Sequence, residues 1–496
     1  MRALYLPFVL GLIASCGPSD RNAGQCTDSA HCDMGPCNAG DTRTCYTGAM
    51  GTEGVGPCTG GNQTCLAGGT WGNCEGEVLP KTENCTDGID NNCNGMVDED
   101  IDQDGDGWTT CGGDCCDSTE CSNPAEVNPG AFEVPGDGID NDCDGMVDNA
   151  VPLCDTGLSS SSGTPGDYAK AIDLCQTATM ADKKWGVLDA KLTLADGMGT
   201  PNASSRSIRP KFGTNVMPQV GASMAVISSG TAAAKGDTNP DWTDPQSSFM
   251  AGTNSGFPAD FLSANMGTLP NAPGCPAPDI QGGANDPVML TLKIRVPTNA
   301  HSFTIKSNFY SAEFPEWVCS AYNDFFVILL DSAYNGNPAN PADKNLAFYT
   351  PPNSTMNYPV GVNLAHGDTG LFTMCKSGGT GCAPGAKTGT ITCPNTIDLA
   401  GTGFDQVGGQ ACGTSNLEGG ATGWLTTTGN VVPGEIITLR IAIWDTSDEN
   451  LDSLALIDAF TWSAQGSDPG TVIERTIEPI QPVSAATGLA VPNEND

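Results

Sequence analysis

Three short segments between residues 83 and 149 carry oxygen-bearing side chains at alternate positions, followed by a glycine. The first is Asp90-Asn-Asn-Cys-Asn-Gly-Met-Val-Asp98, and the last is Asp140-Asn-Asp-Cys-Asp-Gly-Met-Val-Asp148. Between them, Asp102-Gln-Asp-Gly-Asp-Gly-Trp108 repeats the same opening. Ca²⁺ takes roughly six to eight oxygen ligands at about 2.3–2.6 Å, and a loop supplies several of them only by curling around the ion, which glycine permits. The spacing therefore predicts calcium-binding loops.

The predicted ligands are the polar side chains of each loop and the backbone carbonyl of the residue after its glycine, as in the EF-hand order. No loop has Glu at its twelfth place, so these are not EF-hands, and acids from elsewhere such as Asp114, Asp117 or Glu133 would complete the coordination. The predicted ligand set is Asp90, Asn92, Asn94, Met96, Asp98, Asp102, Asp104, Asp106, Trp108, Asp114, Asp117, Asp140, Asp142, Asp144, Met146 and Asp148.

A solvated, disordered acidic linker is the alternative explanation of this stretch, because charge-rich segments with few apolar residues are usually disordered. Two features favour metal loops instead. The acids recur in a fixed register, and cysteines such as Cys93 and Cys143 are interleaved with them. Zinc fits less well than calcium, because the stretch has no CxxC pair and no histidine.

The segment from Glu83 to Glu99 resembles the MopE-type metal-binding motif of bacterial surface and secreted proteins. The Gly-Gly-Asp-Cys at 112–115, the Asn-Pro-Gly-Ala at 128–131 and the second copy at 137–145 fit the same repeat, so the resemblance covers roughly 83–149. The second copy departs from the first, because Pro135 stands where the first copy has Cys85. Cys143 must therefore pair with a cysteine elsewhere.

Composition restricts the partners of the chain. With 496 residues it is long enough for two or three domains, and 20 Lys+Arg against 58 Asp+Glu give a formal net charge of −38. Such a surface repels phosphate backbones, so we expect no nucleic acid partner and regard cations as the natural partners. Only 16% of the residues are charged, and the abundance of Gly, Ser, Thr, Asn and Pro is typical of β-structure and loops.

The N-terminus predicts export. Residues 1–15 have a positive start and a short apolar run, and Ile13-Ala-Ser-Cys16 resembles a bacterial lipobox, which makes Cys16 the expected lipidation site. An ordinary signal peptide is the alternative. Gly17 is not the Asp that resembles an inner-membrane retention signal, so the outer membrane is favoured. The 23 cysteines include Cys16, and the remaining even number allows complete pairing in an oxidising compartment.

The chain after Cys16 divides by composition into five parts. Residues 16–80 predict a disulfide-rich stalk, 81–150 the metal module, 151–165 a linker, 166–465 a large β domain, and 466–496 a polar tail. One helix is expected at 167–175, with Asp167 as a possible cap. Antiparallel strands are expected at 185–194, 223–228, 288–296, 302–309, 325–330, 436–444 and 455–462. The predicted fold class is therefore mainly β, an antiparallel β-sandwich of jelly-roll type preceded by a module with little regular structure.

Part of the β domain resembles a choice-of-anchor L domain. The similar segments are Met224 to Gly230, Phe309-Tyr-Ser-Ala-Glu-Phe with Tyr322-Asn-Asp-Phe-Phe, and Ile437 to Ser453, so the resemblance spans roughly 160–465. It implies a β-sandwich found on anchored bacterial surface proteins, with a binding partner that is not generally known. Here the lipid on Cys16 would be the anchor.

Enzymatic chemistry is not expected. The histidines His31, His301 and His366 lie in unlike contexts, and a triad drawn through His366 and Asp368 lacks a GxSxG elbow. No GxGxxG or P-loop occurs in a strand–helix context, so no nucleotide is expected. A glycosidase pair at Glu313 and Glu316 would need a cleft lined with aromatic side chains, which total only 6%.

A second cation site in the β domain is an open possibility. Five acids occupy two motif segments that could lie side by side, and polar capping of strands explains them equally well. They are Glu313, Asp324, Asp445, Asp448 and Asp452.

The sequence as a whole predicts a non-enzymatic, calcium-stabilised lipoprotein of the outer membrane and cell surface, with a role in adhesion, recognition or envelope structure. Its expected partners are calcium, the membrane and an unknown surface or matrix ligand. The alternatives are a secreted or periplasmic location, a surface carbohydrate-active enzyme that uses the β domain, and a transition-metal scavenger, which would need softer ligands than these loops offer.

Overall fold

The computed structural model describes residues 37–81, 83–98, 100, 102–117, 123–149, 151–246, 252–351, 354–367, 369–406, 412 and 418–473. The chain divides into two compact units, the first formed by residues up to 102 with 109–112 and the second by 103–108 with 113 onward. The predicted signal peptide, Cys16, His31, Asp368 and the last part of the predicted tail lie outside the described residues. No helix in the described part of the chain is both long and apolar enough to cross a membrane.

Disulfides hold the first unit together. Its regular structure is one antiparallel pair, β1 (Thr42–Cys45) and β2 (Gly61–Thr64), and one 3₁₀ turn, η1 (Thr110–Gly112). The buried apolar side chains described in this unit are three cysteines, Cys58, Cys65 and Cys93. Such a segment cannot offset its chain entropy by burying aliphatic side chains, so cross-links replace the core. The bonded pairs are Cys37–Cys65, Cys45–Cys74, Cys58–Cys93 and Cys85–Cys111.

The second unit is built on two antiparallel sheets. The seven-stranded sheet has the order β18 (Gly470–Ile473), β15 (Leu425–Asn430), β8 (Ser302–Ser311), β17 (Ser453–Ser463), β5 (Met224–Ser228) and β4 (Arg206–Arg209), and β14 (Gly420–Ala421) also pairs with β8. The five-stranded sheet has the order β3 (Gly186–Thr193), β7 (Ala284–Arg295), β16 (Ile436–Thr446) and β9 (Phe325–Asp331), and β6 (Asn254–Ser255) also pairs with β7.

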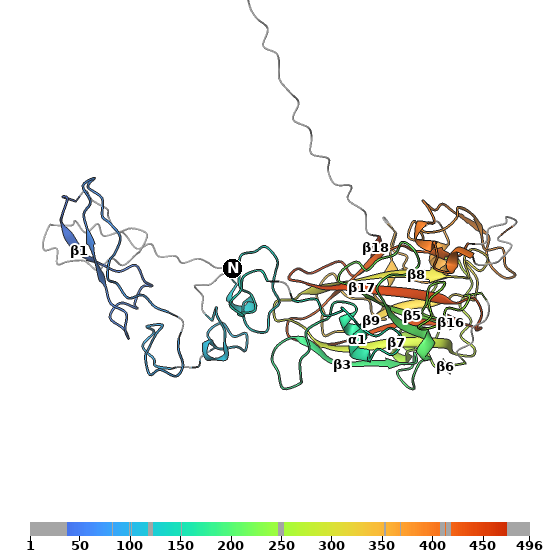
Figure 1. Cartoon of the computed structure of the whole chain (residues 1–496), viewed down its shortest axis with the longest axis horizontal. Helices are drawn as coiled ribbons and strands as arrows, with labels where there is room; N and C mark the ends of the chain where they lie inside the picture. The colour runs from blue at the N-terminus through green and yellow to red at the C-terminus, as the bar shows by residue number, and fades with distance from the viewer. Residues whose placement is uncertain are drawn as a thin grey trace, which may run out of the picture. The chain divides into compact units, whose positions relative to one another are not determined.

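One hydrophobic core joins the two sheets. It contains Ile305 of β8 and Ile457 of β17 from one sheet, and Leu290 of β7 and Ile441 of β16 from the other, all of them fully buried. The sheets therefore pack face to face, and Figure 1 shows them as two layers, with β8 and β17 above β7 and β3. Each strand turns alternate side chains to this core because successive residues point to opposite faces. The predicted mainly β class with antiparallel sheets is confirmed.

The helices are short. α1 (Pro165–Lys170) begins after Thr164, whose side chain forms a capping box with Asp167 at the third helical position. The helix predicted at 167–175 thus begins two residues earlier and ends five residues earlier in the structure, and its N-cap is Thr164 instead of Asp167. α2 (Ala259–Ala264) and the 3₁₀ turns η2 (Pro124–Glu126), η3 (Ala203–Ser205), η4 (Val362–Ala365), η5 (Ile397–Leu399) and η6 (Phe404–Gln406) lie in connections.

Small additional elements complete the second unit. Two hairpin-like pairs are β10 (Phe348–Tyr349) with β11 (Tyr358–Pro359), and β12 (Gly378–Thr380) with β13 (Gly389–Ile391). The predicted linker at 151–165 is tied to the end of the α1 region by the Cys154–Cys175 disulfide. β18, at 470–473, lies within the segment predicted as a polar tail and pairs with β15.

Candidate metal centre

The loop from Asp140 to Asp148 gathers carboxylates in the second unit. Glu133, Asp140 and Asp142 each offer an oxygen atom, and these atoms all lie within 4.8 Å of one another. The Asp140 carboxylate also fixes the turn, because it accepts the backbone N–H of Asp144 at 3.1 Å and that of Gly145 at 2.9 Å. Gly145 has a φ of +92°, a conformation that favours glycine, so the loop can curl as the sequence predicted.

Glu133 closes the same loop from outside the motif. Its Oε1 atom accepts the backbone N–H of Asp142 at 3.0 Å, whereas Oε2 is buried and has no hydrogen-bond partner. Burial raises the pKa of Asp142, and the negative charges of Asp144 and Glu133 raise it further. No ion pair in the described part of the chain neutralises these acids. A cation with oxygen preference would supply the missing charge.

The first copy of the motif has the same architecture in the first unit. The backbone N–H of Gly95 donates to Asp90 Oδ2 at 2.8 Å, and that of Asn94 donates to Asp90 Oδ1 at 3.1 Å. Glu83 accepts the N–H of Asn92 at 3.0 Å, just as Glu133 accepts that of Asp142. Glu83 was not among the predicted ligands. The signal was present, because Glu83 precedes Asp90 by the same interval as Glu133 precedes Asp140.

A third group lies in the second unit around Asp114. Oxygen atoms of Asp104, Asp106 and Asp114 lie within 4.8 Å of one another. The Asp114 side chain is 2% exposed, its Oδ1 accepts the N–H of Cys116 at 2.8 Å, and its Oδ2 has no partner. Burial raises the pKa of Asp114 to about 6, and the neighbouring Asp106 and Asp104 carboxylates also raise it. This group is a loop completed by an acid from outside it.

Asp117, another predicted ligand, lies beside the same loop. One of its carboxylate oxygens is within 4.8 Å of an Asp104 oxygen, and Asp117 also accepts the N–H of Gln103 at 2.6 Å. The Lys183 ammonium lies over the Trp108 ring, 5.4 Å from the ring centroid, and donates to the Gly107 carbonyl at 2.6 Å. Asp102 is the last residue of the longer segment of the first unit.

The ninth-position acids hydrogen-bond to backbone N–H groups of the preceding turn. Asp148 accepts the N–H of Gly136 at 2.7 Å and that of Asp137 at 3.1 Å, while Asp98 accepts that of Gly88 at 3.0 Å. Both carboxylates therefore fix the turn that precedes their own loop. At the fifth position, Asn94 and Asp144 accept the N–H of the methionine after the glycine, each at 2.8 Å. The side chains of those methionines, Met96 and Met146, are exposed.

The cysteines that the structure describes are not available as metal ligands. Cys143 pairs with Cys115, so it does find a partner elsewhere, and in the first copy Cys93 pairs with Cys58 instead of with Cys85. Every described cysteine is disulfide-bonded. A deprotonated thiol is what binds a metal, so oxygen atoms are the donors that remain in the loops.

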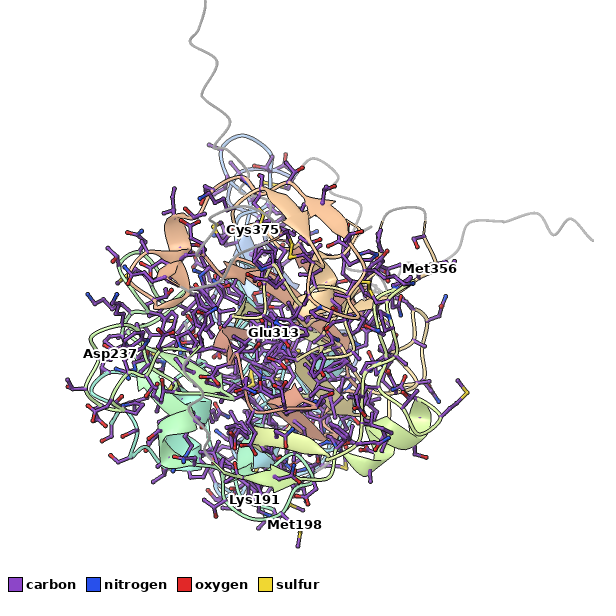
Figure 2. All side chains as sticks on the ribbon, turned by 90° about the vertical axis from the view of Figure 1, so that its right-hand side faces the viewer. Lys191, Met198, Asp237, Glu313, Met356 and Cys375 are labelled. Atoms are coloured by element: carbon purple, nitrogen blue, oxygen red, sulfur yellow. A yellow bond between two sulfur atoms is a disulfide. The ribbon has the colours of Figure 1, made fainter. Side chains whose placement is uncertain are left out.

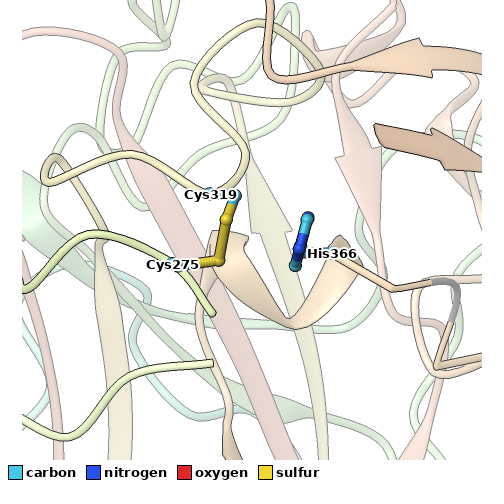
Figure 3. A group of neighbouring side chains, drawn as sticks. All are labelled: Cys275, Cys319 and His366. Carbon is cyan, nitrogen blue, oxygen red and sulfur yellow. A yellow bond between two sulfur atoms is a disulfide. The ribbon is translucent and has the colours of Figure 1, made fainter. Parts of the chain in front are cut away.

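A histidine and two cysteines also lie close together in the β domain. Figure 3 shows His366 beside Cys275 and Cys319, whose sulfur atoms are bonded to each other. The disulfide removes both thiolates, so this group does not form a soft-metal site. His301 lies elsewhere, with its Nε2 atom 3.6 Å from Glu126 Oε1.

Comparison with known families gives two matches. The family described as "Putative metal-binding motif" matches residues 80–99 and 122–149, and the "Choice-of-anchor L domain" matches 280–462. The second match is narrower than the predicted 160–465, but it contains β7, β8, β9, β16 and most of β17. No curated protein and no solved structure gives a match. The chain thus carries a metal-binding motif followed by a choice-of-anchor L domain, and this combination indicates a surface-associated metal-binding protein.

Proposed function

We propose that this protein is a non-enzymatic, calcium-binding lipoprotein of the outer membrane and cell surface, in which calcium binding completes the fold of the 83–149 segment. The observation that carries the proposal is the Glu133, Asp140 and Asp142 group, whose oxygens lie within 4.8 Å of one another. Like charges held this close repel one another until a cation neutralises them, so binding and folding are coupled.

The chemistry of the donors supports calcium over softer metals. The loop donors are carboxylate, amide and carbonyl oxygens, which suit Ca²⁺, whereas copper and zinc favour histidine and thiolate. The segment 83–149 contains no histidine, and its described cysteines are consumed in disulfides. The name of the matched motif family refers to copper, so Cu²⁺ is the metal that competes with calcium in this proposal.

The location proposed for the protein rests on its N-terminus and its disulfides. Ala14-Ser-Cys16 has the small residues expected before a lipidated cysteine, and bonded cysteines persist only in an oxidising compartment. The β domain would then contact a surface or matrix ligand in adhesion or recognition. Cys16→Ser should release the protein from the membrane fraction or leave its signal peptide uncleaved. Unchanged fractionation and mass of Cys16→Ser would contradict the lipid anchor.

Limited proteolysis of the full-length chain tests the coupling of calcium to folding. Calcium at millimolar level should protect 83–149 from cleavage, and a chelator should remove the protection, because extracellular calcium modules bind with Kd on the order of 10⁻⁴–10⁻³ M. The variant Asp140→Ala should lose protection at 133–149 while 83–98 stays protected. The exposed Asp468→Asn is the matched control and should behave as wild type. Cleavage that is equal with calcium and with chelator would contradict the proposal.

A further inference from the structure

Four strand ends bring acids together at one end of the two sheets. Asp445 near the end of β16 pairs with Asn285 of β7, and Asp324 immediately precedes β9. From the other sheet, Asp452 precedes β17, and Glu313 lies two residues beyond the end of β8. Figure 2 labels Glu313 near the middle of the domain in the end-on view. The acids of the two sheets lie close together, because the hydroxyl of Ser453 in β17 donates to Asp324 Oδ2 at 2.6 Å.

Three of these acids are buried and have carboxylate oxygens without a hydrogen-bond partner. Asp445, Asp452 and Glu313 are 1%, 2% and 3% exposed, yet both carboxylate oxygens of Asp445, both of Asp452 and the Oε2 of Glu313 have no hydrogen-bond partner. The Ser229 hydroxyl and the Asp324 carboxyl both lie close to Asp445, and the Ser229 hydroxyl donates to the Ser453 carbonyl at 3.3 Å.

Polar capping of strands does not explain this arrangement. A capping carboxylate accepts backbone N–H groups, as Asp324 does from Thr446 at 3.4 Å, whereas neither Asp445 nor Asp452 makes such a bond. Gly230 packs against Asp452 so closely that an added Cβ atom would lie 1.8 Å from its Oδ2 atom. The Asp452 carboxylate therefore occupies a buried site without hydrogen-bond donors. Burying a charged carboxylate in this way costs free energy unless a proton or a cation neutralises it.

No basic side chain provides that neutralisation. The ion pairs of the described residues leave out Glu313, Asp324, Asp445 and Asp452. Burial raises the pKa of Asp324 to about 7 and raises the pKa values of Asp445, Asp452 and Glu313 well above their ordinary range, with neighbouring carboxylates adding to each shift. The cluster must therefore hold protons or a cation.

We propose that Asp445 and Asp452 bind a hard divalent cation, Ca²⁺, between the two sheets of the β domain, and that Asp324 and Glu313 add negative charge around it. This site is separate from the loops and does not depend on the function proposed for them. Among the described residues, no three carboxylate oxygens of the cluster lie within 4.8 Å of one another, unlike in the loop groups. Hydroxyl and carbonyl oxygens nearby, such as those of Ser229 and Ser453, would therefore complete the coordination, as calcium permits.

The test uses the full-length chain with its loops silenced by Asp90→Asn, Asp104→Asn and Asp140→Asn. Calcium at about one hundred times its Kd should still raise the Tm of this variant by about 5–10 °C. Adding Asp445→Asn or Asp452→Asn should abolish the shift, and adding the exposed Asp468→Asn should leave it intact. Asn has the shape of a neutral carboxyl group, so each variant can fold if the wild-type group is merely protonated.

Two results would overturn the site. The first is a loop-silenced chain whose Tm does not respond to calcium, because the β domain then binds none. The second is a calcium shift that persists in both Asp445→Asn and Asp452→Asn, because the cluster is then neutralised by protons. If either substitution prevents folding, hydrogen exchange of the loop-silenced chain decides the matter: calcium should slow exchange in peptides covering 313–325 and 444–453, and unchanged exchange there would reject the proposal. A negative result for this site would not affect the proposal for the loops, because proteolysis of 83–149 measures calcium binding by the loops alone.

Discussion

Asp142→Asn should have opposite effects on the protein with and without calcium. Asp142 has two acidic neighbours, Asp140 and Glu133, with oxygens within 4.8 Å. At that separation each pair of charges repels by about 1 kcal/mol in water and about 3 kcal/mol at an effective dielectric constant near 20. Asp142 is partly buried, so the true value lies between these limits. Solvent screening of this partly exposed group favours the lower limit, so removing its charge, which relieves both pairs, should stabilise the calcium-free protein by about 2–3 kcal/mol.

The same substitution should weaken calcium binding at this loop. Asn retains one oxygen donor but gives up the charge, and a loss of about 1.4 kcal/mol of binding free energy corresponds to a tenfold increase in Kd. We expect at least that for Asp142→Asn, and more for Asp142→Ala, which removes the oxygen as well. Calorimetric titration gives the Kd, and thermal denaturation in chelator gives the calcium-free stability.

The first copy of the motif supplies the matched control, because it has Asn92 at the corresponding position. Asn92→Asp should strengthen calcium binding by the first loop and lower the calcium-free stability of its unit. The electrostatic argument would be refuted if Asp142→Asn and Asp142→Ala kept the wild-type Kd. It would also be refuted if Asp142→Asn lowered the Tm in chelator.

Three further predictions concern other parts of the chain. Asp173→Asn should stabilise the protein by about 1–2 kcal/mol at pH 8 and hardly at pH 4. Burial raises the pKa of Asp173 to about 6, so the wild-type protein loses stability as this carboxyl group ionises with rising pH. Equal pH profiles of the two proteins in thermal denaturation would contradict this. Asp260→Asn should cost about 1 kcal/mol at pH 7, with the difference shrinking below about pH 4, because hydrogen bonds from Arg440 hold the pKa of Asp260 well below its usual range. A difference in urea-denaturation midpoint that is as large at pH 2 as at pH 7 would argue against it. Replacing both Cys58 and Cys93 by Ala should cost about 2–4 kcal/mol and expose the first unit to protease, and unchanged cleavage would show that the disulfide is dispensable.

The strands of the core could be predicted because their side chains alternate. The segment 436–444 reads as a half-buried strand and forms most of β16, and 302–309 likewise forms most of β8. β15 was not predicted, because Leu425-Thr-Thr-Thr-Gly-Asn shows no apolar alternation. Its buried Thr427 is satisfied by a hydroxyl hydrogen bond to Thr471 of β18 at 2.8 Å, a pairing between distant segments that a local pattern does not reveal.

The loops could be predicted from spacing, but the roles of individual acids depend on tertiary contacts. Asp140 and Asp142 lie together as their spacing implied, since neighbours on a curled loop are forced together. Asp148 has the same chemistry but accepts backbone N–H groups from the preceding turn. Glu83 was overlooked although it precedes Asp90 by the same interval as Glu133 precedes Asp140, and its hydrogen bond with the N–H of Asn92 shows that it faces the loop. Sequence spacing fixes which residues can be ligands, whereas the turn between them decides which ones point inward.

Elemental analysis of the purified full-length protein tests the central claim most directly. The protein would be equilibrated with calcium, copper and zinc together, freed of unbound metal, and analysed beside a variant carrying Asp90→Asn, Asp104→Asn and Asp140→Asn. The loops predict several calcium ions per chain, fewer in the variant, and no stoichiometric copper or zinc in either. Stoichiometric copper or zinc without calcium, or equal calcium in the two proteins, would contradict the account.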